Sequence, residues 1–406
     1  MLARHHGEIV LVWGAIPGER VAARVERHAK GLLFAETIDV LSASADRRSL
    51  AHDWRCGGNV LAHVSYPRQL QLKSEIIRDA FGRIGRIPLT GSPAVVGSPE
   101  AGYRIRARLH AQDGRLGFYR EGTHELCDAA RTAQLSSATN VWLTHAESVL
   151  SAMPRERRSA VAAIEVAESV VGDQRACHVE LHSDSPPATY VALADGLVGL
   201  SATPADGTEV YRVGAPTITD VISPCENGAA LRLQRDVRAF FQGNRFLVER
   251  LVRYVLTQIQ PGPAVDLYAG VGLFGLSLAA SGTGMVTVVE GDPVSSADLQ
   301  RNAEPFGDRV HVERRSVESY LSRPVRKTDG ASVIIDPPRT GVSRDAMAGL
   351  LRARPKTVVY VSCDVATLAR DARAFIDAGY ELGALTAMDL FPNTAHVESI
   401  ATFTHS

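Results

Sequence analysis

The chain has 406 residues, of which 45% are apolar and 22% charged, and its formal net charge is −1. That length exceeds one ordinary hydrophobic core, so two or three domains are expected. The sequence contains no apolar run of 18 or more residues and no charged leader followed by a short apolar core, which argues against a membrane span or an export signal and predicts a cytoplasmic protein. A net charge near zero neither favours nor excludes a nucleic-acid partner.

The cysteines are odd in number and widely spaced along the chain. This pattern argues against a disulfide framework and suits a reducing compartment. The five are Cys56, Cys127, Cys177, Cys225 and Cys363.

Residues 1 to about 45 alternate in the manner of short strands interrupted by glycine and proline, as in the turn Ile16-Pro17-Gly18-Glu19. Such a pattern predicts a small β-barrel. Strands are expected over Ile9–Trp13, Val21–Val25, Leu32–Ala35 and Glu36–Val40.

The middle of the chain mixes helical and strand signals. From Pro67 onward the apolar residues recur at helical spacing. Residues from about 100 to 235 return to strand signals separated by turns, with one helical stretch expected over Arg155–Ser169. We therefore predict an α+β middle domain over residues 56–235.

One strand of this region is basic on alternate positions. The arginines are at 104, 106 and 108, while Tyr103, Ile105, Ala107 and Leu109 have the other parity, so the two sets face opposite sides of a sheet. Arg115 and Arg120 follow on the next strand, across the turn at Asp113-Gly114, so a hairpin is expected to present five guanidiniums with a single acid nearby. Arginine binds phosphate in a bidentate manner, which makes this face a candidate for RNA backbone contact. A solvated sheet face is the alternative.

A glycine turn follows a short buried strand in the last third of the chain. The strand is expected over Ala264–Tyr268, and glycines at 270, 272 and 275 let the chain turn into a helix. The next apolar run ends in Glu290, which is placed to accept hydrogen bonds from the two hydroxyls of a ribose. The pattern predicts a bound nucleoside cofactor. It does not distinguish nicotinamide enzymes from S-adenosylmethionine (SAM) enzymes, and a glycine turn without ligand is the remaining alternative.

Strands and helices alternate after this turn, which predicts a parallel, doubly wound sheet with ligands at the carboxyl ends of the strands. The last two strands are joined by residues 391–396 alone, too short a link for a crossover helix, so they must form an antiparallel hairpin. That ending is typical of class I SAM-dependent methyltransferases. A helix is expected over Phe241–Leu256, and strands over Met285–Glu290, Val310–Glu313, Ser332–Asp336, Thr357–Ser362, Leu382–Leu390 and Val397–Phe403.

Four motifs occur in this region at strand ends or just before the first strand: residues 240–244 (FFQGN), 336–341 (DPPRTG), 362–364 (SCD) and 391–398 (FPNTAHVE). Together they closely resemble the RNA (uracil-5-)-methyltransferase family over roughly residues 236–404. The stretch GEIVLVWGAIPGERVAARV, residues 7–25, resembles the TRAM domain, an OB-like RNA-binding barrel. The family pattern usually has a further strand before this point, so either the barrel is incomplete or the recorded start is too late.

The resemblance implies an α/β fold class, with a class I SAM-methyltransferase Rossmann-like sheet over residues 236–406. It implies a TRAM/OB-like RNA-binding barrel over residues 1–45, preceding the α+β middle domain.

The chemistry of uracil explains which residues such a site needs. Carbon C5 is a poor nucleophile until a thiolate adds to C6, and a base must later remove the C5 proton so that the thiolate can leave. By resemblance, Cys363 is the nucleophile, Glu398 is the base, and Asp336 orients the cofactor and the uracil edge. Gln242, Tyr268, Gly270, Gly272, Glu290 and Ser316 are the expected SAM contacts. Each of these residues also has a purely structural alternative. Cys363 could be a small buried apolar residue, Glu398 could form a hairpin ion pair with His396, and Asp336 could simply end a strand.

The sequence departs from the family at two places. Asp364 stands where the family commonly has asparagine, and an acid there would raise the pKa of the Cys363 thiol unless Arg339 or Arg370 compensates. Relatives with a TRAM domain often hold a four-iron cluster on four cysteines. Here Cys56 and Cys127 match two ligand positions, and Leu50 and Asn59 occupy the others, so neither an iron–sulfur cluster nor any other metal is expected.

The leading hypothesis is therefore a SAM-dependent enzyme that methylates uridine C5 in structured RNA. The TRAM-like start favours 23S ribosomal RNA over transfer RNA. The alternatives are a tRNA uracil-5-methyltransferase, an RNA-binding or folding factor with low activity, and a nicotinamide oxidoreductase, which gives Cys363 and Glu398 no role. Neither a membrane nor an obligate protein partner is expected.

Overall fold

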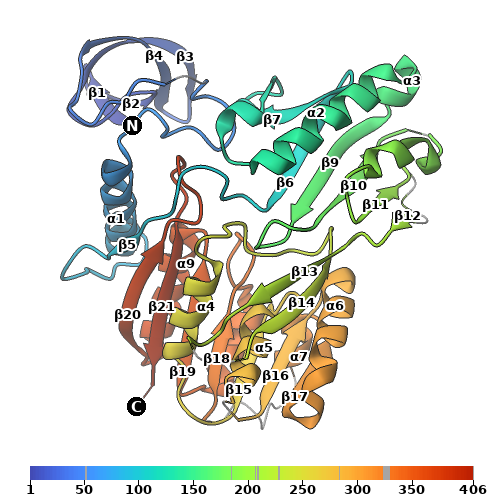
Figure 1. Cartoon of the computed structure of the whole chain (residues 1–406). Helices are drawn as coiled ribbons and strands as arrows, with labels where there is room; N and C mark the ends of the chain where they lie inside the picture. The colour runs from blue at the N-terminus through green and yellow to red at the C-terminus, as the bar shows by residue number, and fades with distance from the viewer. Residues whose placement is uncertain are drawn as a thin grey trace.

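The computed structural model describes residues 1–50, 53–183, 185–205, 207, 210–226, 229–282, 284–322 and 330–405. Figure 1 shows a small N-terminal sheet in blue, a middle sheet in green, and below them a large C-terminal sheet in orange and red.

The N-terminal sheet has four strands in the order β1-β2-β4-β3. Its small core is formed by Val10, Val12, Ala15 and Ala35. One long strand, β4, replaces the two strands expected over residues 32–40, because no turn-forming residue separates Ala35 from Glu36. The bounds are β1 Leu2–His5, β2 Glu8–Trp13, β3 Arg20–Ala29 and β4 Leu32–Ser42.

The middle sheet has seven strands in the order β12-β11-β10-β9-β6-β7-β8. Helix α2 supplies Trp142, Leu143 and Leu150 to the core that it shares with this sheet. The bounds are β6 Arg106–Gln112, β7 Arg115–Tyr119, β8 Leu126–Asp128, α2 Ser137–Ala152, α3 Arg155–Arg158, β9 Val161–Glu168, β10 Arg175–Leu181, β11 Gly199–Thr203 and β12 Tyr211–Gly214, with short 3-10 helices at Ala130–Thr132 and Pro187–Ala194.

The helix expected over Arg155–Ser169 is wrong. Only the single turn α3 forms, and the chain then enters β9, which lies between β10 and β6. Because both faces of β9 are covered, its apolar residues do not alternate, and such a run cannot be told from a buried helix by periodicity. Helix α2 is not among the predicted helices, although the Ser136 hydroxyl caps its start by accepting a hydrogen bond from the Thr139 N–H at 3.1 Å.

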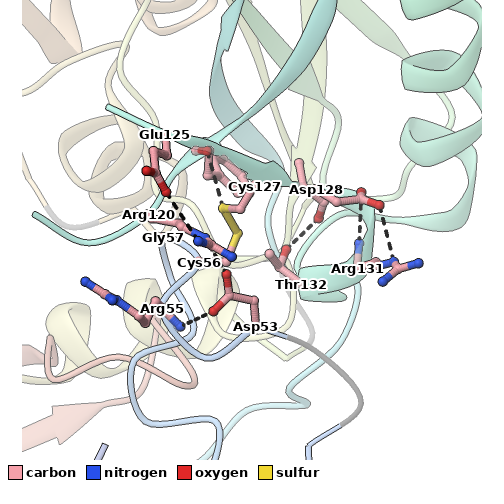
Figure 2. Close-up of a disulfide and its surroundings, with 12 residues drawn as sticks. Asp53, Arg55, Cys56, Gly57, Arg120, Glu125, Cys127, Asp128, Arg131 and Thr132 are labelled. Atoms are coloured by element: carbon pink, nitrogen blue, oxygen red, sulfur yellow. Dashed lines mark hydrogen bonds and ion pairs between the residues drawn. A yellow bond between two sulfur atoms is a disulfide. The ribbon is translucent and has the colours of Figure 1, made fainter. Parts of the chain in front are cut away.

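Cys56 and Cys127 form a disulfide, so the expectation that the scattered cysteines are unpaired is wrong for these two. Figure 2 shows the bond joining the segment before helix α1 (Tyr66–Arg83) to strand β8. The same junction contains an ion pair between Arg120 and Asp53 at 2.6 Å and a hydrogen bond from Gly57 N–H to the Tyr119 carbonyl at 3.0 Å. The partners are 71 residues apart, a separation that sequence spacing does not reveal.

The C-terminal sheet has eight strands in the order β17-β16-β15-β18-β19-β21-β20-β5. The first five are parallel, and β21 runs antiparallel to both β19 and β20, which confirms the predicted terminal hairpin. The strand bounds are β15 Ala264–Leu267, β16 Val286–Glu290, β17 Val310–Arg314, β18 Ser332–Ile335, β19 Thr357–Ser362, β20 Glu381–Met388 and β21 Glu398–Thr404. The helix bounds are α4 Val248–Thr257, α5 Leu273–Ala280, α6 Pro293–Ala303, a 3-10 helix Glu304–Arg309, α7 Val317–Leu321, α8 Arg344–Ala353 and α9 Val365–Asp377.

Three segments that begin within the predicted middle domain, residues 56–235, contact the C-terminal sheet or the helices beside it. Helix α1 (Tyr66–Arg83) contacts α9, and strand β5 (Val95–Val96) adds to the sheet beside β20. The hairpin of β13 (Thr217–Ile222) and β14 (Leu231–Asp236) contacts α6. The helix expected from Phe241 begins only at Val248. Among the described residues, no helix has the length and apolar character needed to cross a bilayer.

Candidate active site

Close packing requires glycine at two positions of the turn after β15. Gly272 has φ +102° and begins α5, and a Cβ there would lie 2.4 Å from Leu276 Cδ1. A Cβ on Gly275 would lie 2.4 Å from Val288 Cγ1, so only glycine lets α5 approach the sheet this closely. The Gly275 N–H donates to Asp266 Oδ2 at 2.7 Å, and burial raises the Asp266 pKa to about 8. Asp266, which lies inside β15, therefore anchors the turn.

Glu290 faces this turn, as expected. Its Oε2 accepts a hydrogen bond from the Gly270 N–H at 2.8 Å, and its Oε1 accepts one from the Asp292 N–H at 2.6 Å. A carboxylate oxygen has a second lone pair, so both oxygens keep acceptor capacity for a ribose diol. A Cβ on Gly270 would meet only the Phe240 carbonyl, at 4.0 Å, so the space beside the turn is open. These residues fit a nucleoside cofactor.

Tyr268 and Ser316 flank the same edge of the sheet. Tyr268 has φ +61°, an uncommon conformation for a bulky residue, at the point where β15 ends. The Ser316 hydroxyl accepts from the Ser319 N–H at 3.2 Å and caps α7. A Cβ on Gly291 would lie 3.1 Å from Ser316 Cα, which places Ser316 next to the Glu290 loop.

Asp336 follows the end of β18 and is held by Gln242. The Gln242 side-chain amide donates to Asp336 Oδ2 at 2.9 Å. Burial raises the pKa of Asp336 to about 7, and the Gln242 hydrogen bond opposes that rise. The structure thus brings together two predicted residues that are 94 positions apart in the chain.

Cys363 follows the end of β19 and lies among three charged groups. Burial, followed by the charges of Glu398 and Asp336, raises the pKa of its thiol to about 11. Arg339 opposes this rise through its charge and through a hydrogen bond to the sulfur. The predicted compensating cation is therefore Arg339. Arg370 is paired with Asp371 at 2.8 Å instead.

Glu398 is the first residue of β21 and is only 1% exposed. Its Oε1 has no hydrogen-bond partner among the described residues. Burial, followed by the charge of Asp336, raises its pKa well above the usual value, and Arg339 opposes the rise. Oε1 therefore keeps its capacity to accept a hydrogen bond or a proton from a bound ligand.

Asp364 does not have the effect expected from its position. Its carboxylate accepts from the Thr367 N–H at 2.8 Å and caps α9. The acids that raise the pKa of Cys363 are Glu398 and Asp336, from other strands. The prediction that the adjacent acid perturbs the thiol is therefore wrong, because the helix start engages that carboxylate.

The expected arginine face is less basic than predicted. The strand alternation is confirmed, since Ile105, Ala107 and Leu109 are buried. However, Arg106 pairs with Glu165 of β9, and Arg108 pairs with Glu180 of β10. The expectation of a single nearby acid is wrong.

The remaining three arginines of the face differ from one another. Arg104 donates to Gln134 Oε1 at 2.7 Å and is half-buried. Arg120 pairs with Asp53 at 2.6 Å and Glu125 at 3.3 Å. Arg115 is exposed, and within the described part of the chain it has no ion-pair partner.

Comparison with known proteins gives a consistent result. The family model for tRNA (uracil-5-)-methyltransferases matches residues 226–405. A 23S rRNA (uracil(1939)-C(5))-methyltransferase, RlmD, from Halomonas elongata is 31% identical over 98% of this chain and 85% of its own length. Its counterpart from Klebsiella pneumoniae is 30% identical over 99% of this chain and 92% of its own length. The chain belongs to the RNA (uracil-5-)-methyltransferase family.

A solved structure agrees with this membership at the level of fold. The tRNA (uracil-54, C5)-methyltransferase of Pyrococcus abyssi, determined with S-adenosyl-L-homocysteine, has a TM-score of 0.76 and 23% identity, covering 97% of this chain and 95% of that one. As a member of the RNA (uracil-5-)-methyltransferase family, the protein is a SAM-dependent RNA methyltransferase. The nicotinamide oxidoreductase alternative is thereby excluded.

Proposed function

We propose that the protein methylates C5 of a uridine in 23S ribosomal RNA. The observation that carries this proposal is the convergence of Cys363, Glu398, Asp336 and Arg339 at one edge of the C-terminal sheet. A thiol beside a buried carboxylate is what addition to uracil C6 and removal of the C5 proton require. Relatives named for 23S rRNA methylation align over nearly the whole chain. With a ribosomal substrate, we also propose a cytoplasmic location.

In the proposed mechanism, the Cys363 thiolate forms a bond to C6, and the electron pair of the C5–C6 double bond moves toward the C4 carbonyl. Carbon C5 then accepts the methyl group. Glu398 removes the C5 proton, the double bond re-forms, and the C6–sulfur bond breaks to regenerate the thiolate. The proton taken up by Glu398 passes to solvent. Asp336, held by Gln242, orients the uracil edge beside the cofactor.

When bound, SAM would supply the electrophilic methyl group; the methyl–sulfur bond would break, and S-adenosyl-L-homocysteine would be the leaving group. We propose that Glu290 accepts the ribose hydroxyls, that Gly270 and Gly272 form the turn beneath the nucleoside, and that Tyr268, Gln242 and Ser316 complete the pocket. The open space beside Gly270 and the remaining lone pairs of Glu290 support this assignment.

Mapping of methylated uridines tests the function directly. Mass spectrometry of total RNA from cells with and without the gene is expected to show the loss of one 5-methyluridine in 23S ribosomal RNA. Loss of a tRNA methylation instead would favour the tRNA enzyme. If no methylated uridine is lost from any RNA, the alternative of an RNA-binding or folding factor with low activity would be favoured.

We further propose that RNA backbone contact is made by the N-terminal sheet, as a TRAM-like domain, and by the arginine face of β6 and β7.

Arg115 is the member of that face whose charge is least neutralised by nearby acids, so Arg115→Ala is expected to lower the log–log salt slope of RNA binding by roughly 1 or somewhat less. Filter binding over a salt series measures the slope. Arg83→Ala is the matched control, because Arg83 is exposed on α1, outside that face. Equal slopes for wild type and Arg115→Ala would remove Arg115 from the RNA surface.

Arg339 is expected to set the pH dependence of the enzyme. The thiolate reacts and its pKa is about 11, so kcat/KM should rise roughly tenfold per pH unit between about pH 7 and about pH 9. Arg339→Met removes the group that lowers this pKa, so kcat/KM should fall at every pH in the range, by roughly tenfold for each unit of further rise. Arg339→Lys should recover part of the loss. Arg370→Met, which removes the neighbouring cation bound to Asp371, should leave the profile unchanged. An Arg339→Met profile that overlays the wild type would contradict the assignment.

A further inference from the structure

Helix α1 presents a polar face to the catalytic hairpin. Tyr66, Gln69 and Lys73 recur at spacings of three and four, which places them on one side of the helix. All three donate or accept hydrogen bonds with the link between β20 and β21, residues 389–397. Figure 1 shows α1 beside this red hairpin. The link leads directly into Glu398.

The central contact is an ion pair between Lys73 and Asp389, both of whose side chains are 0% exposed. The Lys73 ammonium also donates to the Phe391 carbonyl at 3.0 Å. The second carboxylate oxygen of Asp389 accepts from the Tyr66 hydroxyl at 3.0 Å. Removing two charges from water is costly, and replacing such a pair by apolar groups is often neutral or stabilising for folding. Stability alone does not explain the pair.

A second anchor holds the tip of the link. Gln69 makes two hydrogen bonds to Asn393: its amide donates to Asn393 Oδ1 at 2.9 Å, and its carbonyl accepts from the Asn393 N–H at 3.0 Å. Asn393 has φ +65°, a conformation that asparagine tolerates better than most residues. The link is therefore tied to α1 at two points, one turn of helix apart.

The same network reaches the segment that carries Gln242. The Tyr66 hydroxyl accepts from the Ser98 N–H at 2.7 Å, and the Asn244 amide donates to Ser98 Oγ at 2.9 Å and to the Leu390 carbonyl at 3.3 Å. Asn244 lies two residues after Gln242, the partner of Asp336. Contacts from α1 thus extend to both acids of the site.

The position of Glu398 explains why such anchors matter. The pairing of β19 with β21 ends at Ser362 and Ser399. Cys363 and Glu398 each lie one residue beyond that last pair, where the ladder between these two strands no longer fixes their separation. The chain on the other side of Glu398 is the link that α1 holds.

We propose that Lys73, through Asp389 and the Phe391 carbonyl, is a positioning residue that keeps the Glu398 carboxylate in place for removal of the C5 proton. Gln69 has the same role at Asn393. This inference rests on the proposed function, since it assumes that Glu398 resolves a Cys363–uracil adduct. The Lys73 side chain is 0% exposed and is bonded to Asp389 and to the Phe391 carbonyl, so its role is positioning and not catalytic.

The test separates adduct resolution from methyl transfer in a single turnover with SAM and a uridine-containing rRNA fragment. The double variant Lys73→Met with Asp389→Asn removes both charges together, so no unpaired charge stays buried. We expect methyl transfer to stay within about threefold of wild type while decay of the covalent adduct slows at least about tenfold, a split typical of a step-specific defect. SAM affinity should be unchanged. Arg235→Met with Asp220→Asn is the matched control, because it removes another ion pair whose side chains are both 0% exposed, between β14 and β13.

A double variant that resolves the adduct at the wild-type rate would overturn the proposal, whatever its melting temperature. If the double variant does not fold, Gln69→Leu decides. Slowed resolution supports the proposal and an unchanged rate overturns it. Glu398→Gln distinguishes this inference from the mechanism beneath it. If Glu398→Gln fails to trap an adduct, the proposed mechanism is wrong. If Glu398→Gln does trap the adduct but the Lys73 and Gln69 variants resolve it at the normal rate, only the positioning role is refuted.

Discussion

Replacing Cys363 by alanine is expected to abolish methylation while leaving SAM affinity nearly intact. Without the thiolate, C5 of uracil is not activated, so turnover should fall below about one hundredth of wild type. The proposed SAM site consists of Glu290, the glycine turn and their neighbours, and does not include Cys363. Methyl transfer from labelled SAM and equilibrium dialysis of SAM measure the two properties.

The matched control is Cys225→Ala, because Cys225 is a second free thiol and is exposed on the surface. It should turn over at the wild-type rate and show that loss of a thiol by itself is harmless. Residual activity in Cys363→Ala above about one hundredth of wild type would remove Cys363 from the nucleophilic role. A parallel loss of SAM binding would show that the variant disturbs the fold.

The candidate site was predictable because its residues sit in short motifs at strand ends. A parallel sheet brings the carboxyl ends of its strands to one edge, so Asp336 and Cys363 had to lie close once the strands were assigned. Glu398 follows from the antiparallel hairpin, which returns the chain to that edge. The glycines were predictable for the same reason, since each is needed by a local turn or a close helix approach.

Contacts between distant segments were not predictable in the same way. The acids that pair with Arg106 and Arg108 come from β9 and β10, and β9 was itself mistaken for a helix. Lys73 is separated from Asp389 by 316 residues, and a lysine on a helix is usually solvated. The helical spacing of apolar residues predicts α1. Its buried polar face is not predictable, because that face is buried only by contact with a distant segment of the chain.

Replacing Glu398 by glutamine is expected to trap the RNA on the protein. The amide cannot take up the C5 proton, so the C6–sulfur bond cannot break after the methyl group has been transferred. Formation of the adduct should not suffer, because the Glu398 charge is one of the groups that raise the Cys363 pKa. Removing that charge favours the thiolate. A complex of labelled rRNA fragment and protein that survives denaturation should accumulate toward one RNA per chain and be visible on a denaturing gel.

The trapped species also reports which group carries the RNA. The double variant Cys363→Ala with Glu398→Gln should form no denaturation-resistant complex, because in the proposed mechanism the Cys363 sulfur makes the bond to C6. A complex that persists in the double variant would mean that another nucleophile had reacted. If Glu398→Gln by itself turns over normally and leaves no adduct, a different base removes the proton. Asp336 would then be the next candidate, because its pKa of about 7 places it between its charged and neutral forms near neutral pH.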